Sequence, residues 1–493
     1  LPYRTNGAYA DRSLTNLAKE LTERLRAEQP FDPHVADLWD QVVELWVAIE
    51  KGHNDWDVPA YGGTLFSTYP EVNPDGAALA GIALTDAQFG PTLTALLVDV
   101  GPDGLLGPVD FRSLSVREFG TIYEGLLESE LSVARSDLAE VKGNLVPAGE
   151  GDEVVVAEGE IYFHNRSGVR KSTGSYFTKP FAVEHLLRHA LAPALDDHLE
   201  RVRELVVAGD EAGAARALFD FRVADIAMGS GHFLVAAIDH LEARFSRFLA
   251  DHPIPVVNAN LDALCRAAER MLGDLADRYR IETTQVLRRL ITRRCVYGVD
   301  LNPISVELAR LGVWIHTFVP GLPLSFLDHN LVVGNSLTGI GTLDEVADFV
   351  EGGLAEANIR KQLGAAQPHL DRLAALGDAT IDDIEAARDA ADAARDSLAD
   401  ATRLLDMLVL ARADLAELDP LMLTDEDAVA RRHATAEAQE HLSALEPLHF
   451  PLTFPEVFAG TRPGFDCLLG NPPWDEMHVN ADKFWTRHMP GHM

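Results

Sequence analysis

The segment at residues 470–474, Gly-Asn-Pro-Pro-Trp, places two hydrogen-bond acceptors beside an aromatic ring. Pro472 and Pro473 lack backbone N–H groups and hold the chain extended, so the Pro472 carbonyl has no regular partner. The side chain of Asn471 adds a second carbonyl. With the ring of Trp474, these acceptors suit a planar group that carries an exocyclic amine, which donates two hydrogens and stacks. The alternative is a proline-stiffened loop with a buried tryptophan.

A glycine-containing turn at residues 225–233 is the second candidate site, because it follows a short apolar run and opens an apolar, helix-like segment. Gly229 and Gly231 allow a tight turn and a close approach of the backbone to a ligand. The turn is not a dinucleotide fingerprint, since Leu234 stands where a third glycine is required.

A carboxylate ends the next apolar run, at Asp300. A doubly wound fold places at this point the acid that holds ribose hydroxyls, although an aspartate here can also cap the helix that follows. Taken with the turn at residues 225–233, Asp300 predicts a site for an adenosine-like ligand.

The elements that position these residues alternate between strands and helices from about residue 180 onward. The pattern predicts a helix over 181–206, strands at 222–226 and 295–299, and helices from Phe233 and Ile304. We therefore predict an α/β class with a doubly wound, Rossmann-like parallel sheet.

Three units are expected along the chain. Residues 1–150 are predicted to form a helical N-terminal domain, and 151–180 a hairpin and linker. The remainder, 181–493, is predicted to be the sheet domain, which carries a long helical insert at 345–445 that contains an antiparallel pair of amphipathic helices.

The composition restricts the partners of the chain. Its 77 acidic and 42 basic residues leave a net charge of −35, the wrong sign for wrapping a phosphate backbone. No run of about 18 apolar residues is present, so we expect no membrane association and a cytoplasmic protein. The three cysteines lie far apart and indicate neither disulfides nor a metal site.

Residues 470–474 resemble the signature of S-adenosylmethionine-dependent DNA methyltransferases that modify the N6 amine of adenine. The run at 170–178 resembles the segment that precedes the cofactor loop in these enzymes, and the runs at 61–66 and 119–126 are similar to parts of the large methylases of type IIG-like restriction and phage-defence systems. One departure is Asn335, where many relatives carry aspartate.

The resemblance implies that S-adenosylmethionine is the cofactor and that residues from several segments hold it. Those implied to contact the cofactor are Tyr176, Phe177, Thr178, Asp225, Ala227, Gly229, Gly231, Phe233, Asp300, Leu301, Asn335 and Ser336. A flipped adenine would stack on Trp474, with Asn471, Pro472 and Pro473 forming the clamp on its amine.

The resemblance also implies double-stranded DNA as the substrate, bound mainly by a C-terminal recognition part expected beyond residue 493. The acidic insert is expected to contact defence-system proteins. Two alternatives stay open: a methyltransferase of this fold that acts on protein glutamine or RNA, and a non-catalytic scaffold that binds the cofactor.

Overall fold

The structure is a computed structural model. It describes residues 7–56, 58–62, 65–101, 104–109, 111, 129–141, 144–149, 151–165, 178–273, 276, 280–349, 354–417, 425–459 and 462–472. The run at 119–126 that carries part of the resemblance lies outside these residues.

A four-stranded parallel sheet forms the centre of the larger part of the chain, and its strands lie in the order β10, β9, β8, β11. The strands are β8 (Val223–Asp225), β9 (Val296–Asp300), β10 (Leu331–Val333) and β11 (Cys467–Leu469). The first and fourth strands along the chain are therefore neighbours, and the winding direction reverses between them. This sheet confirms the predicted α/β class and has its switch point between β8 and β11.

Successive residues of the strands pack into different cores, as the two-residue period of a strand requires. Val223 and Val296 lie in the main core with the buried face of α11 (His232–Asp251). Ala224 and Tyr297 pack into an aromatic cluster with residues of α21 (Phe450–Thr453) and α22 (Pro455–Phe458) and with Phe454 between these helices. Both faces of the sheet are thus covered, which explains its apolar strands.

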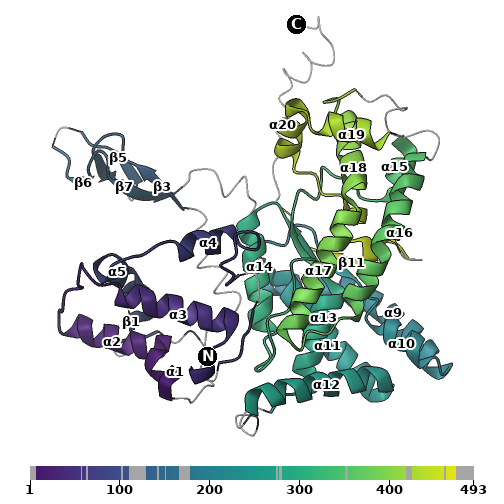
Figure 1. The fold of residues 1–493 in the computed structure, drawn as a ribbon, viewed down its shortest axis with the longest axis horizontal. Coiled ribbons are helices and arrows are strands. Elements are labelled where there is room, and N and C mark those ends of the chain that lie inside the picture. Colours follow the sequence, from purple (N-terminus) through teal and green to yellow (C-terminus); the bar gives the residue numbers. More distant parts are fainter. Residues whose placement is uncertain are drawn as a thin grey trace, which may run out of the picture.

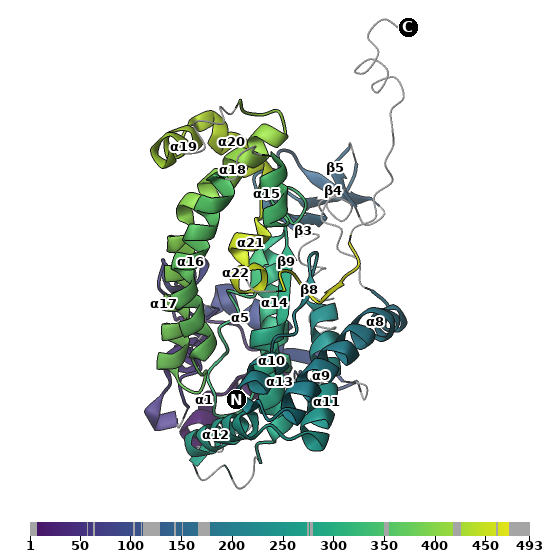
Figure 2. The same ribbon diagram turned by 90° about the vertical axis from the view of Figure 1, so that its right-hand side faces the viewer.

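The helices around the sheet follow the predicted alternation (Figures 1 and 2). They are α8 (Pro180–Leu186), the π-helical turn η3 (Leu187–Leu191), α9 (Ala192–Val207), α10 (Glu211–Leu218), α12 (Pro255–Leu272), α13 (Thr283–Cys295) and α14 (Pro303–His316).

A helical unit precedes the sheet and lies beside it in Figure 1. Leu45, Ala48 and Trp56 of this unit belong to the same core cluster as the sheet. It contains α1 (Gly7–Arg12), α2 (Leu14–Arg26), α3 (Asp37–Lys51), η1 (Asn54–Trp56), α4 (Pro74–Ala80), α5 (Asp86–Leu97) and the pair β1 (Val98–Val100) and β2 (Leu106–Pro108). Tyr61 joins this unit to the sheet domain: its carbonyl accepts from the Leu324 N–H at 2.7 Å, and its ring lies 5.6 Å from that of Phe318.

The insert is helical, as expected, and continues beyond a single pair. Its helices are α15 (Leu343–Phe349), α16 (Leu354–Ala375), α17 (Ile381–Ser397), α18 (Ala399–Arg412), α19 (Glu426–His433) and α20 (Ala436–Leu445). α16 and α17 are joined by a short loop and lie side by side (Figure 2). In that loop, the buried Asp378 accepts from Arg289 of α13 at 2.6 Å and from Ser325 at 2.9 Å, which fixes the insert to the sheet domain.

The segment before the linker differs from the prediction. Residues that we expected to be helical form β3 (Ser129–Val133), β4 (Leu138–Val141) and β5 (Asn144–Pro147). The hairpin expected within 151–180 is also wrong, because β6 (Val154–Val156) pairs with β4, and β7 (Ile161–Asn165) pairs with β3. Pairing partners outside the local segment decided the arrangement, and local pattern does not encode them.

Within the described ranges, no helix combines the length and apolarity that crossing a membrane would need. The three cysteines are free thiols. In the same part of the chain, no cluster of three or more histidine, cysteine or acidic side chains is arranged to hold a metal ion.

Candidate functional site

The predicted site residues meet at the carboxyl edge of the sheet, because all four strands run in parallel. Asp225 ends β8 and lies in register with Leu469 of β11 on one side and Gly298 of β9 on the other. Asp300 ends β9 and pairs with Val333 of β10. The loops that begin at these positions therefore start from one edge.

The turn after β8 has the backbone geometry that its glycines predict. Gly229 and Gly231 have φ values of +53° and +79°, in the left-handed region that favours glycine. A Cβ on Gly231 would lie 3.1 Å from the Cβ of Ala309 in α14, so a side chain there would crowd the neighbouring helix. The Met228 N–H donates to the Val299 carbonyl at 3.0 Å, which holds the turn against β9.

Asp300 links this turn to the end of β9. One carboxylate oxygen accepts from the Gly229 N–H at 2.8 Å, and the other from the Asn302 N–H at 2.9 Å. The cap of α14 is Asn302, whose side chain accepts from the Ile304 N–H at 3.0 Å. Capping therefore belongs to Asn302, and each Asp300 oxygen retains a further lone pair for a ligand hydroxyl.

Asp225 is the most unusual titratable group at this edge. It is 1% exposed, and one carboxylate oxygen is buried without a hydrogen-bond partner. Burial raises the pKa of Asp225 to about 7; the bond from the Ala227 N–H, 3.0 Å long, lowers it, and the charge of Asp300 raises it further. A Cβ on Gly470 would lie 2.8 Å from this carboxylate, so the site also needs glycine in the β11 loop.

The signature after β11 contacts Thr178, which belongs to the segment implied to contact the cofactor. The Asn471 side-chain N–H donates to the Thr178 hydroxyl at 3.2 Å, which orients the amide. Pro472 follows and is exposed. Tyr176, Phe177, Pro473 and Trp474 lie outside the described residues.

The loop after β10 completes the edge. Ser336 donates to the Ile226 carbonyl at 2.9 Å and ties this loop to the turn after β8. The side-chain oxygen of Asn335 accepts from the Leu337 N–H at 3.1 Å, so part of its acceptor capacity holds the local turn.

Two further observations refine the predicted set. Leu301 and Leu337 are 51% and 85% exposed, which makes them apolar surfaces at the ends of β9 and β10. Leu337 was not among the predicted residues, and only its exposure identifies it. Phe233 is buried in the main core, so its side chain supports the start of α11 instead of facing solvent at the site.

The arrangement fits an adenosine-bearing cofactor. The turn offers close backbone approach, Asp300 offers acceptors for ribose hydroxyls, and the exposed leucines offer an apolar surface for a base. One oxygen of Asp225 is buried at this edge without a hydrogen-bond partner, and Asn471 brings an amide to the same edge.

Comparison with known proteins gives a family match for part of the chain. Residues 294–488 match the family model described as Eco57I restriction-modification methylase. The matched segment contains β9, β10, the helical insert, β11 and the Asn471 signature. No curated protein and no solved structure matches the chain. By the family match, this chain is similar to restriction-modification methylases, which supports a role as a DNA methyltransferase.

Proposed function

We propose that this chain binds S-adenosylmethionine at the carboxyl edge of its sheet and methylates the N6 amine of an adenine flipped out of DNA. The observation that carries the proposal is the convergence of Asp225, Asp300 and Asn471 at the switch-point edge. The match to restriction-modification methylases over residues 294–488 supports it.

The residues have distinct tasks in this proposal. Asp300 accepts from ribose hydroxyls while it holds the turn at Gly229. Asn471 and the carbonyl of Pro472 accept from the two hydrogens of the target amine, which draws the nitrogen lone pair out of conjugation with the ring. Bound S-adenosylmethionine supplies a methyl group that its sulfonium already makes electrophilic. The positioned amine is therefore the main requirement that the protein must meet.

A base that flips out of the duplex loses its stacking with the neighbouring bases. We propose that stacking on Trp474 replaces this energy. DNA is the proposed substrate and partner. The acidic insert is proposed to contact proteins of the same restriction-modification or defence system.

The test is methyl transfer from radiolabelled S-adenosylmethionine to duplex oligonucleotides with and without adenine. We expect label only in adenine-containing DNA, located at N6 after digestion to nucleosides. Transfer to RNA or to protein glutamine would assign the alternative substrates. Cofactor binding by calorimetry without transfer to any of them, tested across oligonucleotides of many sequences, would favour the scaffold.

A further inference from the structure

A cavity of about 850 Å³ lies at the opposite, amino edge of the same sheet. Its lining includes residues that precede the strands, among them Arg222 before β8, Arg294 before β9 and Asn330 before β10. Helix α16 of the insert forms another wall. The cavity is therefore separate from the candidate cofactor site, which lies where the strands end.

Several arginines line this cavity, and the guanidinium groups of two of them are already paired with other residues of the protein. Arg293 donates to three carbonyls at the end of α16, those of Leu373, Leu376 and Gly377. Arg222 pairs with Asp220 at 2.6 Å and donates to the Val457 carbonyl. These contacts attach the insert and α22 to the sheet.

The guanidinium groups of Arg216 and Arg294 have hydrogen-bond donors without a partner in the described part of the chain. Arg216 is exposed on α10, and its side chain makes no hydrogen bond or ion pair with any residue that the structure describes. Arg294 donates one N–H to the Ala374 carbonyl at 3.0 Å, and its guanidinium lies 5.2 Å from the centre of the Phe219 ring. Its Nε is buried without an acceptor. Leaving a buried donor unpaired lowers stability unless a ligand or water satisfies it.

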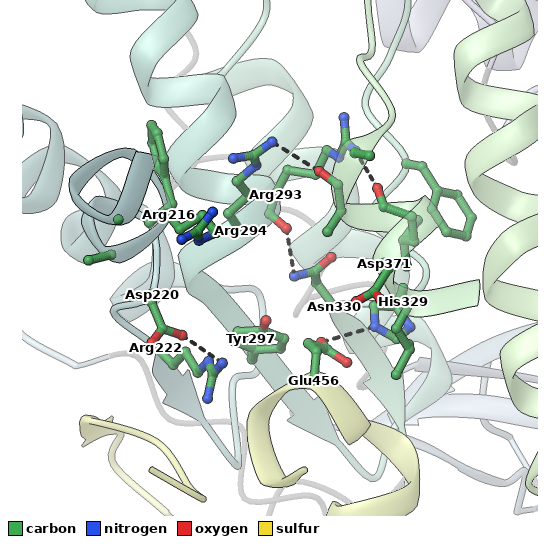
Figure 3. Close-up of a pocket in the computed structure, with 18 residues that line it drawn as sticks. Arg216, Asp220, Arg222, Arg293, Arg294, Tyr297, His329, Asn330, Asp371 and Glu456 are labelled. Atoms are coloured by element: carbon green, nitrogen blue, oxygen red, sulfur yellow. Dashed lines mark hydrogen bonds and ion pairs between the residues drawn. The ribbon is translucent and has the colours of Figure 1, made fainter. Parts of the chain in front are cut away.

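The wall of the cavity opposite Arg216 and Arg294 carries a hydrogen-bond acceptor, the carboxylate of Glu456. One oxygen of Glu456 accepts from His329 at 3.0 Å, and the other is buried without a partner in hydrogen-bond geometry. Against the effect of burial, which raises the pKa of Glu456, the Tyr297 hydroxyl is near enough to this carboxylate to help lower it, after the larger effect of His329. Figure 3 shows Arg216 and Arg294 together at one side of the cavity, the His329–Glu456 pair at the other side, and Tyr297 between them.

The side chains that line the cavity have a net positive charge, whereas the whole chain has a net negative charge. Four arginines line it against three carboxylates, whereas the whole chain carries −35. Burial lowers the pKa of His329, but the adjacent Glu456 carboxylate outweighs it and the net direction is upward. A cationic wall in so acidic a chain favours an anionic ligand.

We propose that this cavity binds a nucleotide, with its phosphate at Arg216 and Arg294 and an amine on its base donating to Glu456. The volume lies within the range of about 300 to 1,000 Å³ that small-molecule sites occupy. Aromatic and aliphatic side chains, including Phe219 and Phe326, supply apolar walls for the ring. Guanidinium groups suit phosphate oxygens.

The test is calorimetry on the full chain with AMP, IMP and inorganic phosphate. We expect AMP to bind and Arg216→Gln to weaken it about tenfold or more, because a hydrogen bond to a charged group is lost. Arg247→Gln, an exposed arginine on α11 outside the cavity lining, is the matched control and should bind AMP normally. S-adenosylmethionine binding should be unchanged in both variants.

Glu456→Gln tests the base end separately. IMP has a carbonyl where AMP has its amine, so the wild type should prefer AMP, and the glutamine side-chain N–H should shift the preference toward IMP. Inorganic phosphate binding as tightly as AMP would overturn the proposal. So would AMP binding that survives Arg216→Gln but is lost in Asp300→Ala, since AMP would then occupy the cofactor site. A single-stranded oligonucleotide that binds more tightly than AMP and depends on Arg216 would also overturn it.

Discussion

Asn471 and Thr178 stand 293 positions apart in the chain, yet their side chains are hydrogen-bonded at 3.2 Å. The bond joins the segment implied to hold the cofactor to the signature implied to hold the target amine. Because the amide N–H is directed to Thr178, the rotation of the Asn471 carbonyl is set by the protein. Preorganisation of this kind is where a polar side chain contributes most to catalysis.

Asn471→Ala should remove most methyl transfer while it leaves cofactor affinity nearly intact. Loss of one preorganised polar group costs about 2.7 to 4 kcal/mol, a fall of roughly 10² to 10³ in turnover. Single-turnover transfer and calorimetry with S-adenosylmethionine measure the two effects. Thr178→Val removes the orienting bond and should cost transfer about tenfold or less. Because Thr178 is also implied to contact the cofactor, its cofactor affinity is measured beside the transfer rate. Equal losses of cofactor binding and transfer in Asn471→Ala would show that Asn471 belongs to the cofactor site.

Asp225 should make the stability of the cofactor-free protein depend on pH. Its pKa is raised to about 7 by burial, from an unfolded value of about 3.9. The native state therefore binds a proton that the unfolded state releases, and this contribution to stability is lost as pH rises from about 4 to 7. The loss would be on the order of 4 kcal/mol at most.

Asp225→Asn should flatten this part of the pH profile and stabilise the cofactor-free protein at pH 8. Thermal unfolding between pH 4 and 8 measures it, with the exposed Asp197→Asn on α9 as control. An unchanged slope in Asp225→Asn would mean that the carboxylate is ionised in the folded protein.

At the scale of elements, the turn after β8 and the start of α14 are held by neighbouring residues with separable roles. Asp300 accepts from the Gly229 and Asn302 N–H groups, and Asn302 caps the helix. The Asp300 carboxylate, which is proposed to bind ribose, therefore also links the end of β9 to the turn after β8.

Asp300→Ala should weaken the cofactor strongly and also lower the stability of the cofactor-free protein by about 1 to 3 kcal/mol, since the Gly229 N–H loses its acceptor. Asn302→Ala should cost about 1 kcal/mol through the lost cap, with a smaller effect on the cofactor. Calorimetry and thermal unfolding on both variants separate the effects. A stability loss in Asp300→Ala without weaker cofactor binding would leave Asp300 a purely structural role.

The fold was predictable from sequence where short-range signals suffice. Residues 222–234 and 295–304 combine a short apolar run, a turn and a helix start, and the structure has these elements in place. The prediction failed at 129–165, where β3 pairs with β7 and β4 with β6. The unpaired oxygen of Asp225 and the cavity at the amino edge could not be predicted either, because each depends on side chains that folding brings together.

A buried ion pair contributes to the attachment of the insert, beside the bonds from Arg293 to the carbonyls at the end of α16. Asp378 lies in the loop between α16 and α17, and Arg289 lies on α13; both are almost fully buried. Asp378→Ala leaves the Arg289 charge unpaired, at a cost of about 3 to 5 kcal/mol. Hydrogen exchange should accelerate in α16 and α17. The double variant Arg289→Met with Asp378→Leu should recover much of the protection, and equal exchange in the single variant and the wild type would contradict the assignment.

At the scale of the whole molecule, charge decides how this chain meets DNA. The net charge is −35, and residues 339–463 carry 25 acidic against 10 basic residues. Helices α16 to α18 belong to this acidic stretch, so they should repel a phosphate backbone. Some adenine methylases read DNA with a domain placed between the two motifs that this insert separates, and its charge argues against that use here.

The 493-residue chain should therefore bind S-adenosylmethionine well and duplex DNA weakly. Each phosphate contact adds about 0.9 to the slope of log affinity against log salt, and specific complexes at physiological salt reach roughly 10⁻⁸ to 10⁻¹¹ M. Fluorescence anisotropy between 50 and 200 mM salt should give a shallow slope and an affinity well below that range, while calorimetry gives cofactor binding in the same buffer. Cross-links from photoreactive DNA should fall near the carboxyl edge of the sheet and avoid residues 370–430. Tight, sequence-specific binding, or cross-links concentrated on α16 to α18, would make the insert the DNA-reading element despite its charge.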